Sequence, residues 1–284
     1  FKSIPHANRD STHLTAHRGT ITIKHLLSHT SGLPEEIPAD VRKQFTKPVK
    51  SLADFVAMAA KVPLLFYPGT EYNYSDLGYY VLGRLIEVAS GMSYEKFVSE
   101  RLFKPLNMLD SYVLLPDSAK KYRIATAYEV KESKLQLSPY YDHSYMSWLT
   151  FPRPSWSMFS TASDLLSFYQ MLLQGGNYRG KRILSAKSVT LMTSAQVKNI
   201  LNRPGFGYGL GVNISLAPTD TTSAVSFGSY GHGGLLGTRG WVDPEWNMIR
   251  IFLIQRLPTS PAEAFIGQER DVFMKLARSA ATKR

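Results

Sequence analysis

The most regular stretch of the sequence reads Tyr74-Ser75-Asp76-Leu77-Gly78-Tyr79-Tyr80-Val81-Leu82-Gly83, and it opens a helix predicted over residues 75–89. Apolar residues recur on one face of this helix at the spacing of about 3.6 residues that is typical of an amphipathic helix; they are Leu77, Val81, Leu85 and Val88. Gly91 follows the last of them and is a typical helix stop. Tyr74 is therefore expected just before a helix N-terminus, with its ring projecting from a fixed turn.

Helical patterns dominate the first part of the chain on both sides of this stretch. Helices are predicted to begin at Thr22, Ser51, Ser93, Thr161 and Ser185, where apolar repeats start, and Thr22 and Ser93 are predicted to be N-caps. Residues 34–48 are predicted to form a loop. Residues 112–155 have no clean period, which is typical of strands or loops.

The sequence changes to glycine-punctuated strands after residue 207. Strands are predicted over residues 208–214, 224–230, 238–242 and 248–255, and Asp243-Pro244 makes a tight connection between the last two. A helix is predicted over residues 262–281. Helices first and antiparallel strands later predict an α+β fold, with an antiparallel sheet flanked by helices. The expected division is a mainly helical subdomain over about 22–175, followed by the sheet and the C-terminal helix over about 176–284.

Composition excludes several classes of protein. The chain has 284 residues, of which 44% are hydrophobic and 19% charged, as is ordinary for a globular protein. Its net charge of +11 comes from scattered lysines and arginines, so we expect a solvated basic surface and no nucleic-acid partner. The absence of cysteine excludes disulfides, thiolate metal sites and a cysteine nucleophile. No apolar run reaches the roughly 18 residues of a membrane helix, so no membrane span is predicted.

Tyr74 is a candidate acid or base. To ionise near pH 7, a tyrosine must lower its pKa by about 3 units, which corresponds to about 4 kcal/mol. One cation at about 4 Å supplies that amount at an effective dielectric constant of 20. A catalytic Tyr74 would therefore need a lysine partner, whereas a packing or capping tyrosine would not.

A second candidate segment is His232-Gly233-Gly234, which follows Gly231. Glycines let a substrate approach the backbone closely, and backbone N–H groups at such a place can stabilise an oxyanion. The alternative is a simple bend in a strand.

His25 and His29 are four residues apart and could face one metal ion. The glutamate of the H-E-x-x-H motif is missing between them. Neutral, hydrogen-bonded histidines near a helix end are therefore the preferred interpretation. No metal and no cofactor is predicted, since the chain also lacks a G-x-G-x-x-G motif.

Four segments together resemble the class C β-lactamase-related serine hydrolases, a family that includes penicillin-binding proteins, D,D-peptidases and carboxylesterases. They are residues 21–33, 74–83, 102–108 and 231–234. The resemblance covers nearly the whole chain, and it implies one β-lactamase/transpeptidase-like domain over residues 1–284. Members of this family are often exported, so the resemblance favours a periplasmic or secreted protein, although no signal peptide precedes the polar residues 8–12.

The resemblance also implies a role for each candidate residue. In the family, an S-x-x-K serine attacks a carbonyl, while its lysine and the tyrosine of Y-x-N move protons. Tyr74 would be the general acid or base, and Asp76 takes the place of the asparagine. His232-Gly233-Gly234 would replace the family's K-T-G, with the Leu235 N–H as oxyanion donor. The expected substrate is an ester, an amide or a β-lactam, and histidine in place of lysine favours the first two.

The chain departs from the family at the nucleophile. No S-x-x-K precedes Ile21, and two other matches do not begin a buried apolar helix; they are Ser93-Tyr94-Glu95-Lys96 and Ser118-Ala119-Lys120-Lys121. We therefore expect an N-terminally truncated domain that is inactive alone and whose partner is its own missing segment. The alternative is a non-catalytic protein that binds a ligand in the same cleft.

Overall fold

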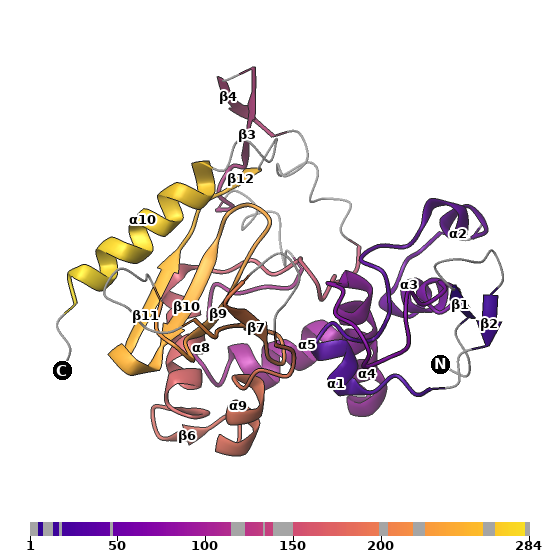
Figure 1. Cartoon of the computed structure of the whole chain (residues 1–284), viewed down its shortest axis with the longest axis horizontal. Coiled ribbons are helices and arrows are strands. Elements are labelled where there is room, and N and C mark those ends of the chain that lie inside the picture. Colours follow the sequence, from indigo (N-terminus) through magenta and orange to yellow (C-terminus); the bar gives the residue numbers. More distant parts are fainter. Residues whose placement is uncertain are drawn as a thin grey trace.

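The structure is a computed structural model that describes residues 5–7, 14–16, 19–45, 48–114, 123–132, 134–138, 150–198, 204–217, 225–257 and 265–281 (Figure 1). Its helices are α1 (Ile23–Leu27), α2 (Ala39–Lys43), α3 (Leu52–Ala59), α4 (Asp76–Ser90), α5 (Tyr94–Val98), η1 (Ser99–Phe103, a π-helical segment), α8 (Ala162–Leu173), α9 (Ala186–Met192), η2 (Pro244–Trp246, a 3-10 turn) and α10 (Phe265–Ser279).

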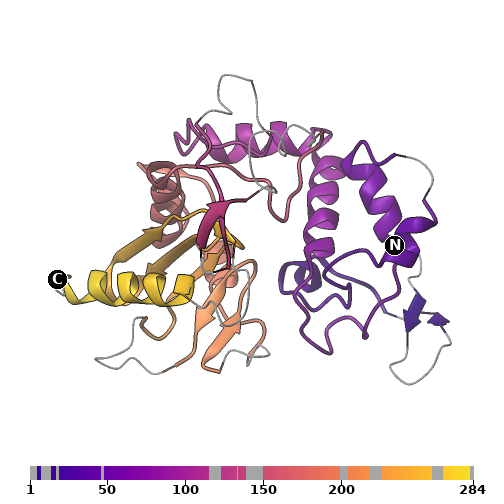
Figure 2. The ribbon, with the colours of Figure 1, turned by 90° about the horizontal axis from the view of Figure 1, so that it is seen from above.

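A five-stranded antiparallel sheet has the strand order β11-β10-β9-β8-β7. These strands are β7 (Phe206–Tyr208), β8 (Asn213–Ser215), β9 (Tyr230–Gly233), β10 (Arg239–Asp243) and β11 (Met248–Phe252). Figure 2 shows the sheet between α10 and α8. An added Cβ at Gly231 would collide with the Gly240 carbonyl oxygen, so glycine is required where β9 approaches β10.

The helices α1 to α4 form a second body beside the sheet (Figure 2). The helix α4 contacts α1, α3 and α5. A buried apolar cluster fills the space between α4, α1 and α3. Its main members are Leu26, Leu33, Met58, Leu64, Leu77 and Val81. A separate cluster lies between the sheet, α8 and the segment after α5, with Leu106, Met171, Leu172, Ile214 and Val242 among its members.

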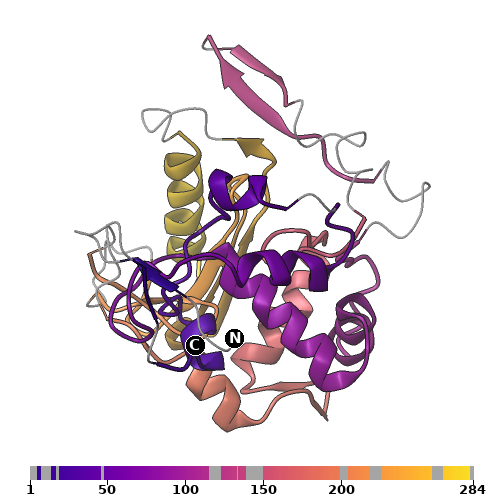
Figure 3. The same ribbon diagram turned by 90° about the vertical axis from the view of Figure 1, so that its right-hand side faces the viewer.

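Smaller strands complete the described chain. A mixed sheet has the order β12-β3-β4, and Figure 3 shows the hairpin β3–β4 extending away from the body of the molecule. Two short hairpins pair β1 with β2 and β5 with β6. These strands are β1 (Pro5–Ala7), β2 (Leu14–Ala16), β3 (Tyr128–Lys131), β4 (Lys134–Leu137), β5 (Asn177–Tyr178), β6 (Lys181–Arg182) and β12 (Arg256–Leu257).

The α+β class and the helix starts predicted from the sequence are confirmed. Thr22, Ser51, Ser75, Ser93, Thr161 and Ser185 all act as N-caps whose side chains accept a backbone N–H. The end of α4 is also confirmed, since Gly91 is left-handed at φ +68°. The division of the chain near residue 175 stays a prediction.

Several finer predictions are wrong. The region 34–48 contains α2 and is not wholly a loop. The strand predicted over 208–214 is two paired strands, because the chain turns between Tyr208 and Asn213. Of the strand predicted over 224–230, residue 224 lies outside the described residues, and residues 225–229 are not in a strand, since β9 begins at Tyr230. Leu85 and Val88 of α4 are exposed, because α1 and α3 cover the Leu77 and Val81 side of that helix.

No helix in the described part of the chain is both long enough and apolar enough to cross a membrane.

Candidate active site

Tyr74 is held in place by the residues on both sides of it. The Asn73 backbone N–H donates to the His29 carbonyl oxygen at 2.9 Å. The Ser75 backbone N–H donates to His29 Nδ1 at 3.0 Å, and the Ser75 hydroxyl donates to the Pro34 carbonyl oxygen at 2.8 Å. The ring centroids of Tyr74 and His29 lie 4.3 Å apart. Tyr74 itself remains 39% exposed, so a fixed backbone presents an accessible phenol.

His29 is the buried centre of this arrangement. Its side chain is almost completely buried, and its backbone is left-handed at φ +56°, which is uncommon for a residue other than glycine. Because Nδ1 accepts the Ser75 N–H, the proton of the neutral ring is on Nε2, which donates to the Tyr208 hydroxyl at 3.1 Å. Burial, together with the nearby His232 charge, lowers the pKa of His29 to about 3. His29 is therefore a neutral ring that positions other groups.

The polar chain that starts at His29 continues through two more tyrosines. The Tyr208 hydroxyl donates to the Tyr79 hydroxyl, and Tyr79 donates to the Leu27 carbonyl oxygen at 3.3 Å. Burial raises the pKa of both phenols well above its usual value. These two tyrosines therefore stay neutral, and Tyr74 is the accessible phenol of the group.

His232 lies on the opposite side of the cleft, near the end of β9. β9 pairs with β10 over residues 230–233, but its pairing with β8 stops at Gly231. Gly234 N–H donates to Thr238 on the β10 side at 2.8 Å. Since consecutive residues of a strand direct their backbone groups to opposite sides, the Gly233 N–H faces away from β10. The glycine segment, His232-Gly233-Gly234, therefore has backbone groups that β8 does not pair with.

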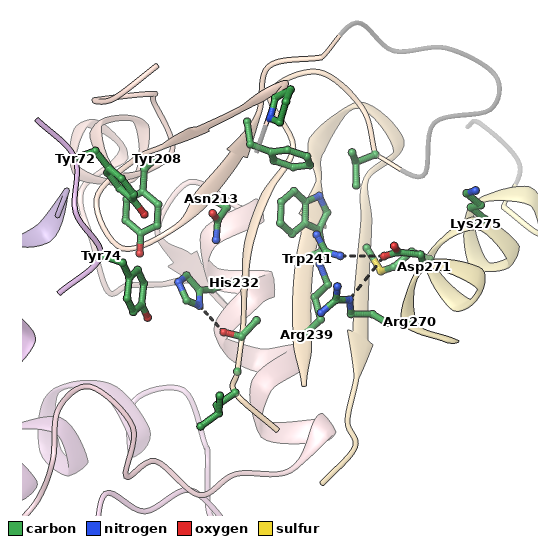
Figure 4. Close-up of a pocket in the computed structure, with 17 residues that line it drawn as sticks. Tyr72, Tyr74, Tyr208, Asn213, His232, Arg239, Trp241, Arg270, Asp271 and Lys275 are labelled. Carbon is green, nitrogen blue, oxygen red and sulfur yellow. Dashed lines mark hydrogen bonds and ion pairs between the residues drawn. The ribbon is translucent and has the colours of Figure 1, made fainter. Parts of the chain in front are cut away.

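The tautomer of His232 follows from its own hydrogen bond. His232 Nδ1 lies 2.6 Å from the Gly233 carbonyl oxygen, which can only accept (Figure 4). Nδ1 therefore carries a proton, and in the neutral ring Nε2 is the acceptor.

The structure brings Tyr74 and His232 to one cleft. Their ring centroids lie 6.2 Å apart with the planes tilted by 30°. The cleft is a cavity of about 740 Å³, and its lining includes the predicted residues His232, Gly233, Gly234 and Leu235. Figure 4 shows the Tyr74 and His232 rings facing each other at one end, with Arg239, Arg270 and Asp271 at the other. Asp271 lies 3.3 Å from Arg239 and 3.7 Å from Arg270.

Asp76 lines a second, smaller cavity that shares Tyr74, Tyr208 and His232 with the first. This cavity of about 140 Å³ is lined by Tyr74, Asp76, Tyr79, Pro154, Ser155, Tyr208, Gly211 and His232. Burial and then the negative charges of Glu35 and Glu36 raise the pKa of Asp76 to about 6, although a hydrogen bond from Ser155 opposes the shift. Asp76 thus belongs to the same site as Tyr74 and His232.

The other candidates from the sequence lie elsewhere. Ser93 is the N-cap of α5, where its hydroxyl accepts the Lys96 backbone N–H at 3.2 Å, and it lines neither cavity. Ser118 and Lys121 lie outside the described residues. His25 caps α1 through a capping box with Thr22, so it does not face His29 across a metal site. Among the described residues, no group of three or more His, Cys, Asp or Glu side chains could hold a metal ion.

Sequence reasoning missed Tyr208 and its link to His29. Tyr208 is on β7, 179 residues from His29, and no local pattern connects the two. The glycines on either side of Tyr208 were the available signal, because they mark a place where the backbone is closely approached.

The chain is similar to proteins of one family. Residues 9–271 match the sequence model of the family described as beta-lactamase. A similar protein is Rv1367c of Mycobacterium tuberculosis, 29% identical over 271 residues, which cover 90% of this chain and 67% of that protein. Penicillin-binding protein 4 of Amycolatopsis lactamdurans is 33% identical over 223 residues, which cover 77% of this chain and 54% of that protein. This chain therefore spans about one half to two thirds of the length of these relatives.

A solved structure supports the fold. The hydrolase EstCE1, described as having promiscuous acyltransferase activity, superposes with a TM-score of 0.74 at 22% identity, covering 90% of this chain and 72% of that one. The β-lactamase/transpeptidase-like fold predicted from the sequence is thereby confirmed.

Proposed function

The chain belongs to the beta-lactamase family, and from this premise we propose that it forms the acid–base and oxyanion parts of a serine hydrolase site. The substrate is an ester, an amide or a β-lactam, and the reaction proceeds through an acyl-enzyme. The serine nucleophile is supplied by an S-x-x-K segment that lies outside residues 1–284. The observation that carries this proposal is the meeting of the Tyr74 and His232 rings at 6.2 Å in one cleft.

Tyr74 takes the acid–base role in this proposal. The serine hydroxyl loses its proton to the Tyr74 phenolate as its oxygen bonds to the substrate carbonyl carbon. When the tetrahedral intermediate collapses, the bond to the leaving alcohol or amine breaks, and Tyr74 returns the proton to that leaving group. Water then attacks the acyl-enzyme by the same route in reverse and releases the acid. The neutral His29 supports this role by fixing the turn that holds the phenol.

The glycine segment takes the oxyanion role. As the carbonyl carbon becomes tetrahedral, its oxygen gains negative charge, and backbone N–H donors stabilise that charge without reorganising. We assign this donation to the Leu235 N–H, with Gly233 and Gly234 leaving room for the acyl group. Asp76 supports the site beside Tyr74.

Esters and amides are favoured over penicillins. A penicillin carries a carboxylate, which a permanently charged lysine binds well at neutral pH. His232 stands where the family has that lysine, and an imidazole lacks the permanent positive charge of a lysine. The loss of this charge weakens carboxylate binding but leaves the reaction at a neutral carbonyl unaffected.

Covalent labelling tests the proposal. A fluorophosphonate probe and p-nitrophenyl butyrate are presented to the chain of residues 1–284 and to the same chain joined to the sequence encoded before Phe1. We expect labelling and turnover only where an S-x-x-K serine is present, with the label on that serine. Labelling of a serine within residues 1–284 would contradict the proposal.

The same experiment separates the enzyme from a ligand-binding protein. If the preceding sequence folds with the chain but contains no S-x-x-K, and neither polypeptide reacts, the non-catalytic alternative replaces the enzyme. The observation that keeps this alternative in view is that no S-x-x-K precedes Ile21 in the sequence.

A further inference from the structure

We infer that Tyr208 is a positioning residue, which sets the separation between the wall of the cleft that holds Tyr74 and the wall that holds His232. Its contacts carry this link, whereas the effect of the link on catalysis rests on the proposed function. Tyr208 is the last residue of β7, is buried and lines both cavities. Figure 4 shows it at the same end of the cleft as Tyr74 and His232.

The sheet fixes the backbone of Tyr208. On one side, Tyr208 lies opposite Asn213 of β8. On the other side, its N–H donates to the Val197 carbonyl oxygen at 2.9 Å, and its carbonyl oxygen accepts the Val197 N–H at 3.0 Å. Because both backbone groups of Tyr208 are held by these partners, the sheet sets the point from which its side chain extends.

The side chain of Tyr208 reaches the helical body. Its hydroxyl accepts the His29 Nε2–H at 3.1 Å and donates to the Tyr79 hydroxyl. In the turn that follows β7, the Gly211 N–H donates to the Leu27 carbonyl oxygen at 3.1 Å. The end of β7 and the turn after it are therefore hydrogen-bonded to α4 and to the residues at the end of α1.

Four rings form a closed cycle that includes both walls. Their centroid distances are 4.3 Å from Tyr74 to His29, 4.9 Å from His29 to Tyr208, 6.1 Å from Tyr208 to His232 and 6.2 Å from His232 back to Tyr74. The first three distances limit the fourth, which crosses the cleft. Among the described elements, no strand of the five-stranded sheet is in extensive contact with α1, α3 or α4. A single side chain at this junction can therefore control the separation of the walls.

Loss of the Tyr208 hydroxyl should move Tyr74. Tyr208→Phe keeps the ring but removes the acceptor of the His29 Nε2–H, and a buried donor without an acceptor is unfavourable. His29 should therefore shift towards another acceptor. Its hydrogen bonds with the backbone N–H groups of Asn73 and Ser75 would carry that shift to Tyr74, which lies between them. A displacement of about 1 Å can lower a rate by about 10²-fold.

Steady-state kinetics on the polypeptide that contains the S-x-x-K serine tests the effect on catalysis. Tyr208→Phe should lower kcat for p-nitrophenyl butyrate about tenfold. It should change KM by less than about twofold, because the ring that lines the cavity remains.

Tyr178→Phe is the matched control. Tyr178 is also buried, its hydroxyl lies 2.9 Å from Ser167 Oγ, and it lines neither cavity. This variant should lose stability in urea unfolding to a similar extent as Tyr208→Phe but keep its kcat. Equal kcat values in the two variants would overturn the inference.

Nuclear Overhauser effects (NOEs) measured on residues 1–284 test the geometry without any nucleophile. We expect an NOE between the ring protons of Tyr74 and His232 in the unchanged chain and in Tyr178→Phe, and a weaker one in Tyr208→Phe. An NOE of equal strength in Tyr208→Phe would overturn the inference.

Nitrogen-15 NMR of His29 keeps the inference testable if Tyr208→Phe does not fold. In the unchanged chain we expect a proton on Nε2 that exchanges slowly with water, because the buried Tyr208 hydroxyl accepts it. A proton on Nδ1 of the neutral ring would overturn the inference.

The two readouts separate this inference from the proposed function. An NOE that weakens in Tyr208→Phe, in a protein whose S-x-x-K serine does not react, would support the positioning role and refute the proposed function. Turnover that Tyr208→Phe leaves unchanged would refute the positioning role and leave the proposed function standing.

Discussion

The two walls of the cleft present their functional groups in different ways. The Tyr74 wall holds one accessible phenol on a turn that is fixed by hydrogen bonds to the buried His29. The His232 wall is a short strand, β9, in which two of the four residues are glycine, and its pairing on the β8 side ends before His232. Leu235, beyond the end of that strand, is 67% exposed. One wall therefore fixes the position of a side chain, and the other exposes backbone.

This difference separates the work of the two walls in acyl transfer. Proton transfer needs a side chain at a defined position, whereas oxyanion binding needs backbone N–H groups that a substrate can reach. Mutations in the Tyr74 wall should therefore act through single side chains. Mutations in the His232 wall should act through the support of the sheet.

Tyr74→Phe should have the largest effect, in the polypeptide that contains the S-x-x-K serine. Loss of the hydroxyl removes the acid–base group and should lower kcat for p-nitrophenyl butyrate by about 10²- to 10⁴-fold. Tyr67→Phe, which removes a hydroxyl outside both cavities, is the matched control and should leave kcat unchanged. A Tyr74→Phe enzyme that retains full activity would remove the phenol from the mechanism.

Asp243→Ala should test how far the His232 wall depends on the sheet beneath it. Asp243 and Arg250 form a buried ion pair at 3.5 Å between the neighbouring strands β10 and β11. Breaking a buried pair leaves an uncompensated charge, and its cost is about 3–5 kcal/mol. Urea unfolding measures the loss. Asp271→Ala removes a half-exposed partner of Arg239 and should cost less than about 1 kcal/mol; equal losses in the two variants would contradict this account.

His29 should make stability rise with pH across the acid range. Its pKa is lowered to about 3 in the folded chain, so between that value and the ordinary value of about 6.5 the unfolded chain binds more protons. Stability is therefore complete above pH 6.5 and falls towards pH 3, by up to about 1.4 kcal/mol per pH unit. His29→Gln should remove this contribution to the slope in urea unfolding measured at several pH values. An unchanged slope would mean that His29 takes up protons equally in the folded and unfolded chains.

Asp76 should change the dependence of stability on pH in the direction opposite to His29. Its effect should be weaker, because its carboxyl is partly exposed. Its pKa is raised to about 6 by burial and by Glu35 and Glu36, against the hydrogen bond from Ser155. Between the ordinary value and pH 6 the folded chain binds more protons, so this group lowers stability as pH rises. Asp76→Asn should therefore make the rise of stability with pH steeper over that range. A shallower rise in the variant would show that the carboxylate is instead stabilised by folding.

The Tyr74 wall could largely be predicted from the sequence because local signals define it. Thr22 and Ser75 are N-caps, Gly91 ends α4, and these interactions span only a few residues. Local patterns did not reveal the His29–Tyr208 contact, because His29 lies in the turn after α1 and Tyr208 lies on β7, 179 residues away. Nor did they indicate which face of α4 is covered.

For the His232 wall, the glycine motif could be predicted from the sequence, but the bounds of the strands could not. The turn between β7 and β8 contains the apolar residues Leu210 and Val212, and these made two strands look like one. The start of β9 at Tyr230 is set by its pairing with β10, where Tyr230 lies opposite Val242. Pairing partners of this kind have no signature within one segment of sequence.

A crystal structure of the S-x-x-K-bearing polypeptide with a covalent phosphonate would test the convergence of the two walls most directly. The account predicts a serine–phosphonate adduct between Tyr74 and His232, with one phosphonyl oxygen about 3 Å from the Leu235 backbone nitrogen and the Tyr74 hydroxyl within hydrogen-bond reach of the serine oxygen. An adduct formed outside the cleft, or one whose oxygen lies away from residues 233–235, would contradict it.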